Sequence, residues 1–177
     1  MLEFRLTYRG PLKTKGSATK FDKHSIRKHF QVQLKALWAP EPLVEFGKYI
    51  DPDRELHEGD ISFLELVGSY HFAPLVSQAK GWHAVCSIDI LFMRPSQPGQ
   101  LIGHGGDVPK FSELPDNASA ASSERPFHCL LQDDALVTNL SVRTDRLLAP
   151  VSPNDVELVI HVCVSSTSRT TGNDPIW

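Results

Sequence analysis

The chain has 177 residues, of which 41% are hydrophobic and 22% are charged. This length and mixture are typical of one globular domain with a packed core, and they exclude a wholly disordered chain, a collagen-like fibre and a coiled coil. The net charge of -3 is unevenly distributed, because residues 1–38 contain nine basic and two acidic side chains, a balance of +7, and residues 39–177 therefore carry -10.

The first predicted element is a strand over residues 2–8. Apolar side chains occupy every second position from Leu2 to Tyr8, which is the period of a strand with one buried face. The pattern ends at Gly10. The basic segment that follows, residues 12–21, contains Gly and Ser and is predicted to be a loop.

A helix is predicted over residues 23–38. Asp22 is placed to cap its first turn, and apolar side chains recur with helical spacing from Ile26 to Trp38. Pro40 ends the helix, since proline lacks an amide hydrogen and restricts the residue before it. The segment after it, as far as residue 68, has a mixed, acidic pattern that predicts no element.

Four further strands are expected along the rest of the chain. Residues 69–76 form the first, with Pro74 indicating an edge position or a bulge. Residues 82–93 alternate so strongly that they predict a central strand. After a long loop rich in Pro and Gly, residues 136–147 and 156–164 are expected to form an antiparallel pair.

This order of elements predicts an α+β fold. One basic helix lies near the amino terminus, and no clear crossover helix separates the later strands, which favours a mixed, mainly antiparallel sheet. We expect a single domain over residues 1–164, followed by a polar, flexible tail over residues 165–177.

The ends of the chain predict neither a targeting sequence nor a membrane span. Residues 1–10 alternate polar and apolar side chains and lack the continuous apolar stretch of a signal peptide. The longest apolar runs, such as Ile90–Met93, are far shorter than the ~20 residues that cross a bilayer. We therefore expect a cytoplasmic protein with no membrane partner.

The cysteines predict free thiols. Cys86, Cys129 and Cys163 are odd in number, widely spaced and without a C-x-x-C motif, so a disulfide framework or a structural zinc site is disfavoured. His161 alternates with the apolar residues of the last strand, and a structural role is expected for it.

Two acidic loops are candidate metal sites. Asp107 follows two glycines, and Asp133 and Asp134 directly precede a predicted strand, so that neighbouring strand ends could bring these carboxylates together. Carboxylate oxygens are preferred ligands of Mg²⁺, which can polarise a phosphate and activate an attacking water. The alternative is a solvated turn in which Asp133 or Asp134 acts as a local cap.

Basic side chains of the amino-terminal loop and helix are candidate phosphate contacts. They are Lys13, Lys15, Lys20, Lys23, Arg27, Lys28 and Lys35, and three of them share one helix stripe with Gln31. Each contact with a phosphate would make the affinity for nucleic acid fall with salt. The alternative is an ordinary solvated helix face.

Four segments together resemble the RusA-type Holliday-junction resolvase family. They are Val85–Arg94, Gly105–Asp107, Leu130–Val137 and Val156–Val164. In that family a strand leads into an Asp-x-Asp-Asn motif and a helix that carries a Lys, and a later Asp-Asp pair opens the next strand. The resemblance implies a homodimer that cleaves branched DNA with Mg²⁺.

The resemblance also assigns residues and exposes a departure. Asp107 and Asp134 stand for two catalytic aspartates, and Asp107, Asp133 and Asp134 would hold Mg²⁺. The second aspartate of the motif falls on Pro109, no Asn follows it, and the helix with the Lys is missing. We expect a RusA-like protein that binds branched or duplex DNA and, if active, is a Mg²⁺-dependent endonuclease; the alternative is a non-catalytic binding or interaction protein with the same fold.

Overall fold

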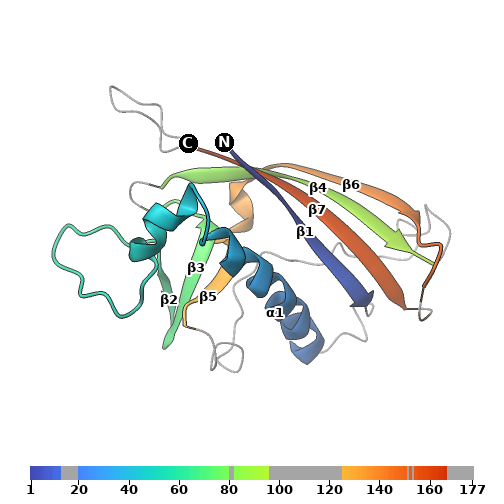
Figure 1. Cartoon of the computed structure of the whole chain (residues 1–177), viewed down its shortest axis with the longest axis horizontal. Helices are drawn as coiled ribbons and strands as arrows, with labels where there is room; N and C mark the ends of the chain where they lie inside the picture. The colour runs from blue at the N-terminus through green and yellow to red at the C-terminus, as the bar shows by residue number, and fades with distance from the viewer. Residues whose placement is uncertain (13–19, 80–81, 96–124, 151, 153, 167–177) are drawn as a thin grey trace.

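The computed structural model of the chain describes residues 1–12, 20–79, 82–95, 125–150, 152 and 154–166. For residues 20–23 only the backbone is described. The described residues form two sheets, one long helix and two short 3-10 helices, with the larger sheet as one layer and the helix and smaller sheet beneath it (Figure 1). The predicted α+β class is confirmed.

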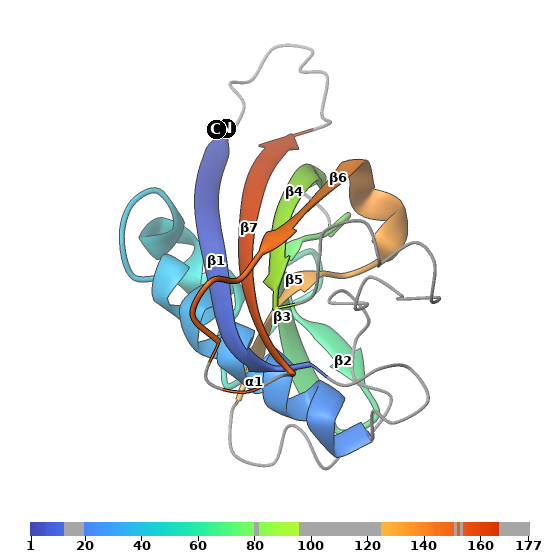
Figure 2. The same cartoon turned by 90° about the vertical axis from the view of Figure 1, so that its right-hand side faces the viewer.

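The larger sheet has four long strands in the spatial order β1-β7-β4-β6 (Figure 2). Their bounds are β1 (Leu2–Pro11), β7 (Asp155–Ser166), β4 (Ala84–Arg94) and β6 (Val137–Arg146). β7 is antiparallel to both of its neighbours, β1 and β4, whereas β6 is parallel to β4. The alternation of apolar residues that predicted strands 2–8, 82–93 and 156–164 is confirmed by the burial pattern of these three strands.

The smaller sheet has the order β2-β3-β5. Its strands are β2 (Glu65–Val67), β3 (Tyr70–Val76) and β5 (Phe127–Leu131), with β2 antiparallel and β5 parallel to β3. β3 is therefore the central strand, and the edge position predicted from Pro74 is wrong for the strand as a whole. Proline is tolerated there because β2 pairs with β3 only as far as Phe72, which leaves that side of Pro74 without a ladder.

The long helix α1 (Lys20–Leu37) covers one edge of the larger sheet. Its Gln33 side chain accepts a hydrogen bond from the Thr7 amide at 3.0 Å and donates to the Thr7 carbonyl at 2.7 Å, as a neighbouring strand would. The helix begins three residues before the predicted start, so Asp22 lies inside its first turns and the predicted capping role of Asp22 is wrong. The 3-10 helices are η1 (Leu43–Tyr49) and η2 (Asp134–Leu136).

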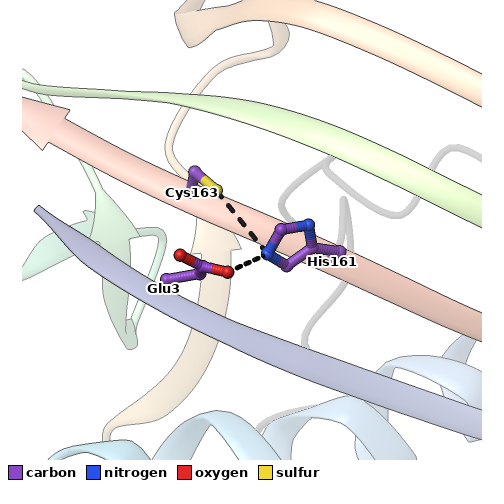
Figure 3. A group of neighbouring side chains, drawn as sticks. All are labelled: Glu3, His161 and Cys163. Atoms are coloured by element: carbon purple, nitrogen blue, oxygen red, sulfur yellow. Dashed lines mark hydrogen bonds and ion pairs between the residues drawn. The ribbon is translucent and has the colours of Figure 1, made fainter.

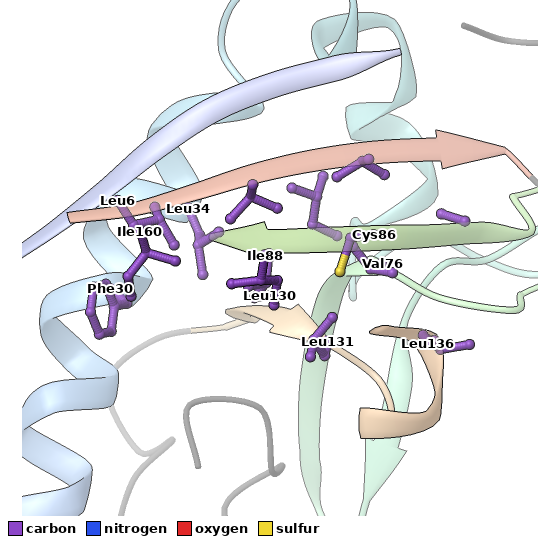
Figure 4. Close-up of a cluster of buried hydrophobic side chains, with 14 of the residues drawn as sticks. Leu6, Phe30, Leu34, Val76, Cys86, Ile88, Leu130, Leu131, Leu136 and Ile160 are labelled. Atoms are coloured by element: carbon purple, nitrogen blue, oxygen red, sulfur yellow. The ribbon is translucent and has the colours of Figure 1, made fainter. Parts of the chain in front are cut away.

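The hydrophobic core lies between the two layers (Figure 4). Cross-strand register aligns the inner-face residues in rows, one of which joins Leu6, Ile160 and Ile90 of β1, β7 and β4. Phe30 and Leu34 of α1 pack against this face beside the small sheet. Each side chain of this kind contributes about 1.5–3 kcal/mol when fully buried, which is why the register of the large sheet is fixed.

The predicted pairing of residues 136–147 with 156–164 is wrong, because β4 lies between β6 and β7. The chain leaves β4, adds β5 to the small sheet and returns to begin β6 beside the start of β4, with Cys86 opposite Val137. This return makes β4 and β6 parallel. A period of two identifies a strand but says nothing about which strand it pairs with.

The last strand runs two residues beyond the predicted end of the domain at residue 164. β7 extends to Ser166, and Ser165 and Ser166 pair with Val85 and Ala84 of β4, so these two residues belong to the sheet. Residues 167–177 of the predicted tail lie outside the described residues. Within the part of the chain that is described, no helix is both long and apolar enough to cross a membrane.

Candidate functional site

The predicted acidic site is represented by Asp133 and Asp134, since Asp107 lies outside the described residues. Both aspartates are exposed at the start of η2. The Asp133 carboxylate accepts a hydrogen bond from the amide of Ala135 at 2.8 Å, so it caps this turn. For Asp133 the structure thus matches the capping alternative.

The turn that carries Asp133 is anchored by its neighbour Gln132. The Gln132 side-chain oxygen accepts hydrogen bonds from the Ser77 hydroxyl and the Gln78 amide, both at 2.9 Å, and its nitrogen donates to Glu65 at 2.7 Å. These contacts tie η2 to the end of β3. Where side chains are described, neither Asp133 nor Asp134 belongs to a group of three or more metal-ligating residues.

The predicted basic stripe is only partly a solvent-facing surface. Lys13 and Lys15 lie outside the described residues, and the side chains of Lys20 and Lys23 are not described. Farther along α1, Gln31, which belongs to the predicted stripe, is only 2% exposed. Its position interrupts the stripe, because this side of the helix turns toward the core.

Three of the predicted basic residues have described side chains. Lys28 and Lys35 are exposed and lie seven residues apart on one face of α1, and Arg27 is half-buried. Neither Arg27 nor Lys28 forms an ion pair with any residue that the structure describes. The middle of α1 therefore carries two positive charges without an ion-pair partner among the described carboxylates.

The positive charges of Arg27 and Lys28 affect the ionisation of the neighbouring His24. Both of its ring nitrogens are buried without a hydrogen-bond partner among the described residues, and its ring lies 6.5 Å from that of Phe127 in β5. Burial lowers the pKa of His24, and the neighbouring charges of Lys28 and Arg27 lower it further. Burial and, to a smaller extent, the same two cations therefore disfavour the protonated form of His24.

A second group of polar side chains lies on the outer face of the larger sheet (Figure 3). His161 Nε2 is 2.7 Å from a carboxylate oxygen of Glu3 and 3.7 Å from the sulfur of Cys163. On the other side of the imidazole ring, Nδ1 is 3.9 Å from a carboxylate oxygen of Asp89. Within the described residues, Glu3, His161 and Cys163 are the only metal-ligating donors that form a group of three.

The sequence offered little sign of this group. His161 and Cys163 stand two residues apart, so they share one face of β7, and this spacing was visible. Glu3 is 158 residues from His161 in the chain and becomes its neighbour only because β1 pairs with β7. The sequence predicted a structural role for His161 and a free thiol for Cys163, but it did not predict that the two side chains lie together.

No family model, no curated protein and no solved structure matches this chain. The resemblance to RusA-type resolvases therefore stays a prediction.

Proposed function

We propose that the protein binds branched or duplex DNA through the basic surface of α1, as its resemblance to RusA-type resolvases implies. The observation that supports this proposal best is the pair Arg27 and Lys28, which forms no ion pair with a described carboxylate. Lys35 extends the same helix surface by two turns. Polyanions are drawn to such unneutralised clusters, and each phosphate contact releases counterions.

We propose binding without hydrolysis as the activity. A Mg²⁺ site needs several oxygen ligands that converge on one ion. Asp133 and Asp134 occupy a short exposed turn, and the Asp133 carboxylate already accepts a backbone hydrogen bond. The motif that would contain Asp107 has Pro109 where the resolvase family has its second aspartate.

The test is a salt titration of DNA binding with a synthetic four-way junction and a matched duplex. For the double variant Arg27→Gln/Lys28→Gln we expect the slope of log affinity against log salt to be shallower by ~1.8, at ~0.9 per phosphate contact. Lys48→Gln is the matched control, because Lys48 is an exposed cation on η1, in the acidic part of the chain. Equal slopes for the wild type and the double variant would contradict the proposal.

A second arm adds Mg²⁺ to the same complexes and follows the length of the DNA strands. We expect intact DNA. Cleavage that is abolished by Asp107→Asn or by Asp134→Asn would refute binding without hydrolysis and would favour a nuclease that uses these residues. Cleavage that survives both substitutions would remove Asp107 and Asp134 from the mechanism.

We also propose the homodimer that the resemblance implies, with the free edge of β6 as its interface. The opposite edge of the sheet is covered at Thr7 by Gln33, whereas no described strand pairs with the outer edge of β6. Two large apolar side chains of β6, Leu140 and Val142, are 54% and 39% exposed. An unpaired strand of this length is a template for a second strand.

Charge complementarity favours one register for this pairing. The Leu147 amide donates to the Arg94 carbonyl, so the backbone groups of Leu147 point toward β4. Because the backbone N–H and C=O groups of successive residues point to opposite edges of a strand, those of Thr144 point to the open edge. Two antiparallel copies of β6 that meet at Thr144 would place Arg143 opposite Asp145 of the partner subunit, twice by symmetry.

A charge exchange tests this register. We expect Arg143→Asp to weaken the dimer, because two carboxylates would then face each other, and Arg143→Asp/Asp145→Arg to restore it. Sedimentation of the full chain over a concentration series measures both effects. A monomer at all concentrations, or a double variant as weak as the single one, would refute the proposed interface.

A further inference from the structure

We propose that Glu3, His161 and Cys163 form a Zn²⁺ site on the outer face of the larger sheet. This inference is independent of DNA binding, since none of the three residues lies on α1. It starts from the convergence of three donor atoms of different chemical types on one point of a polar sheet surface (Figure 3).

The distances between the donor atoms fit one shared ion. The ligand atoms of Glu3, His161 and Cys163 all lie within 4.8 Å of one another. Tetrahedral zinc with bonds of ~2.1 Å to nitrogen and oxygen and ~2.3 Å to sulfur separates its ligands by ~3.4–3.6 Å. The nitrogen-to-sulfur distance of 3.7 Å is close to this range, and the nitrogen-to-oxygen distance of 2.7 Å would have to widen by less than an ångström.

The sheet holds these ligands on a rigid frame. His161 and Cys163 project from the same face of β7 because they are two residues apart, and Glu3 is directly opposite Cys163 in the β1–β7 register. β7 is bonded on both sides, by β1 and by β4. Folding of the sheet therefore brings the three ligands together before any ion binds, so ion binding does not have to order the backbone.

The chemistry of the donors favours zinc over the magnesium expected for a nuclease. A thiolate and an imidazole are ligands of Zn²⁺, whereas Mg²⁺ binds oxygen almost alone. Asp89 adds a second feature of zinc sites. It faces His161 in the β4–β7 register, and its carboxylate lies 3.9 Å from Nδ1. This distance exceeds a hydrogen bond, and a small side-chain shift on zinc binding would let the carboxylate accept from Nδ1–H and leave Nε2 for the ion.

The charges around the site are nearly balanced for a divalent cation. Glu3 and Asp89 supply two negative charges within reach of His161, and Cys163 would add a third by losing its proton when it binds the ion. Arg5, opposite His161 on the β1 side, supplies one positive charge. Three protein ligands leave the fourth position of a tetrahedral ion open to water or to a small anion.

Cobalt substitution on the full chain tests the site directly. Co²⁺ bound by a thiolate gives a sulfur-to-metal charge-transfer band in the near ultraviolet, and added Zn²⁺ removes the band by competition. We expect the band to appear with one equivalent of Co²⁺ in the wild type and in Cys129→Ser, the matched control for a half-buried thiol elsewhere. We expect it to be absent from Cys163→Ser and weakened in Glu3→Gln and His161→Gln.

A second measurement separates metal binding from loss of structure. Zn²⁺ should raise the Tm of the wild type but not that of Cys163→Ser, and Asp89→Asn should lower the Zn²⁺ affinity by ~10-fold or more. Circular dichroism without metal should be the same for all variants, because the three ligands lie on the polar face of the sheet. If Cys163→Ser fails to fold, Glu3→Gln and His161→Gln provide the comparison.

Three results would overturn the proposal. They are no cobalt band in the wild type, a band that persists in Cys163→Ser, and a band that is lost in Cys129→Ser. Any of them would leave the group as a hydrogen-bonded pair of Glu3 and His161 with a neighbouring thiol.

Discussion

Trp82 is the side chain whose removal should damage the fold most. It is 2% exposed, and its ring centre lies 4.5 Å from that of Phe63, 5.4 Å from that of Phe46 and 6.1 Å from that of Trp38. Its indole N–H donates a buried hydrogen bond of 2.7 Å to the carbonyl of Leu75. One residue therefore joins the end of α1, η1, β3 and the start of β4.

The two kinds of contact can be removed separately. Trp82→Ala deletes the ring, leaves a cavity and should lower the free energy of unfolding by about 3–5 kcal/mol. Trp82→Phe keeps most of the apolar contact but leaves the Leu75 carbonyl without its donor, which should cost about 1–3 kcal/mol. Since whole domains are stable by about 5–15 kcal/mol, the alanine variant should be close to unfolding.

Urea unfolding measures both losses. Far-ultraviolet circular dichroism is the suitable signal, because the substitution itself removes a fluorescent indole. Leu66→Ala is the control, since Leu66 is a large apolar side chain that is 64% exposed, and it should lose less than about 0.5 kcal/mol. The reasoning is refuted if Trp82→Ala loses no more than Leu66→Ala, or if Trp82→Phe loses as much as Trp82→Ala.

Two further predictions concern single polar side chains. Burial, Lys28 and Arg27 hold the pKa of His24 below its usual 6.5, so the unfolded chain binds a proton more readily than the folded one. Stability should thus be full above pH 6.5 and fall as the pH drops below it, and His24→Gln should show a shallower fall in urea titrations; an unchanged slope would contradict this. Asp133→Ala should cost about 0.5–1 kcal/mol through its lost cap, and Asp134→Ala less; equal losses would contradict the capping role.

The strands with one buried face were predictable, and the short strand buried on both faces was not. In β4 and β7 the buried and partly exposed residues alternate along almost the whole strand, so the period of two was plain in the sequence. In β5 four of the five residues are buried, and no alternation distinguishes this strand from an apolar loop. α1 packs against β5, and Leu130 and Leu131 of β5 join the core beneath the large sheet.

The candidate sites also differ in how far they could be predicted from the sequence. The Asp133 cap is local, since the carboxylate accepts a hydrogen bond from the amide two residues later. A local cap of this kind could be predicted from the sequence as the alternative to a metal site. The interruption of the basic stripe at Gln31 depends on the rotation of α1 against the sheet, which is set by the core and by no local pattern. The meeting of Glu3 with His161 depends on strand order, which the sequence pattern leaves undetermined.

The place of β7 in the sheet has a consequence for the synthesis of the protein. β7 follows the other described strands in the chain, yet in the sheet it lies between β1, which precedes them, and β4. Leu2 pairs with Val164, so β1 gains its described strand partner only after residue 164 has been made. The contact order is correspondingly high and folding should be slow. A nascent chain that stalls before residue 155 cannot close its larger sheet, and its exposed apolar strands would depend on chaperones.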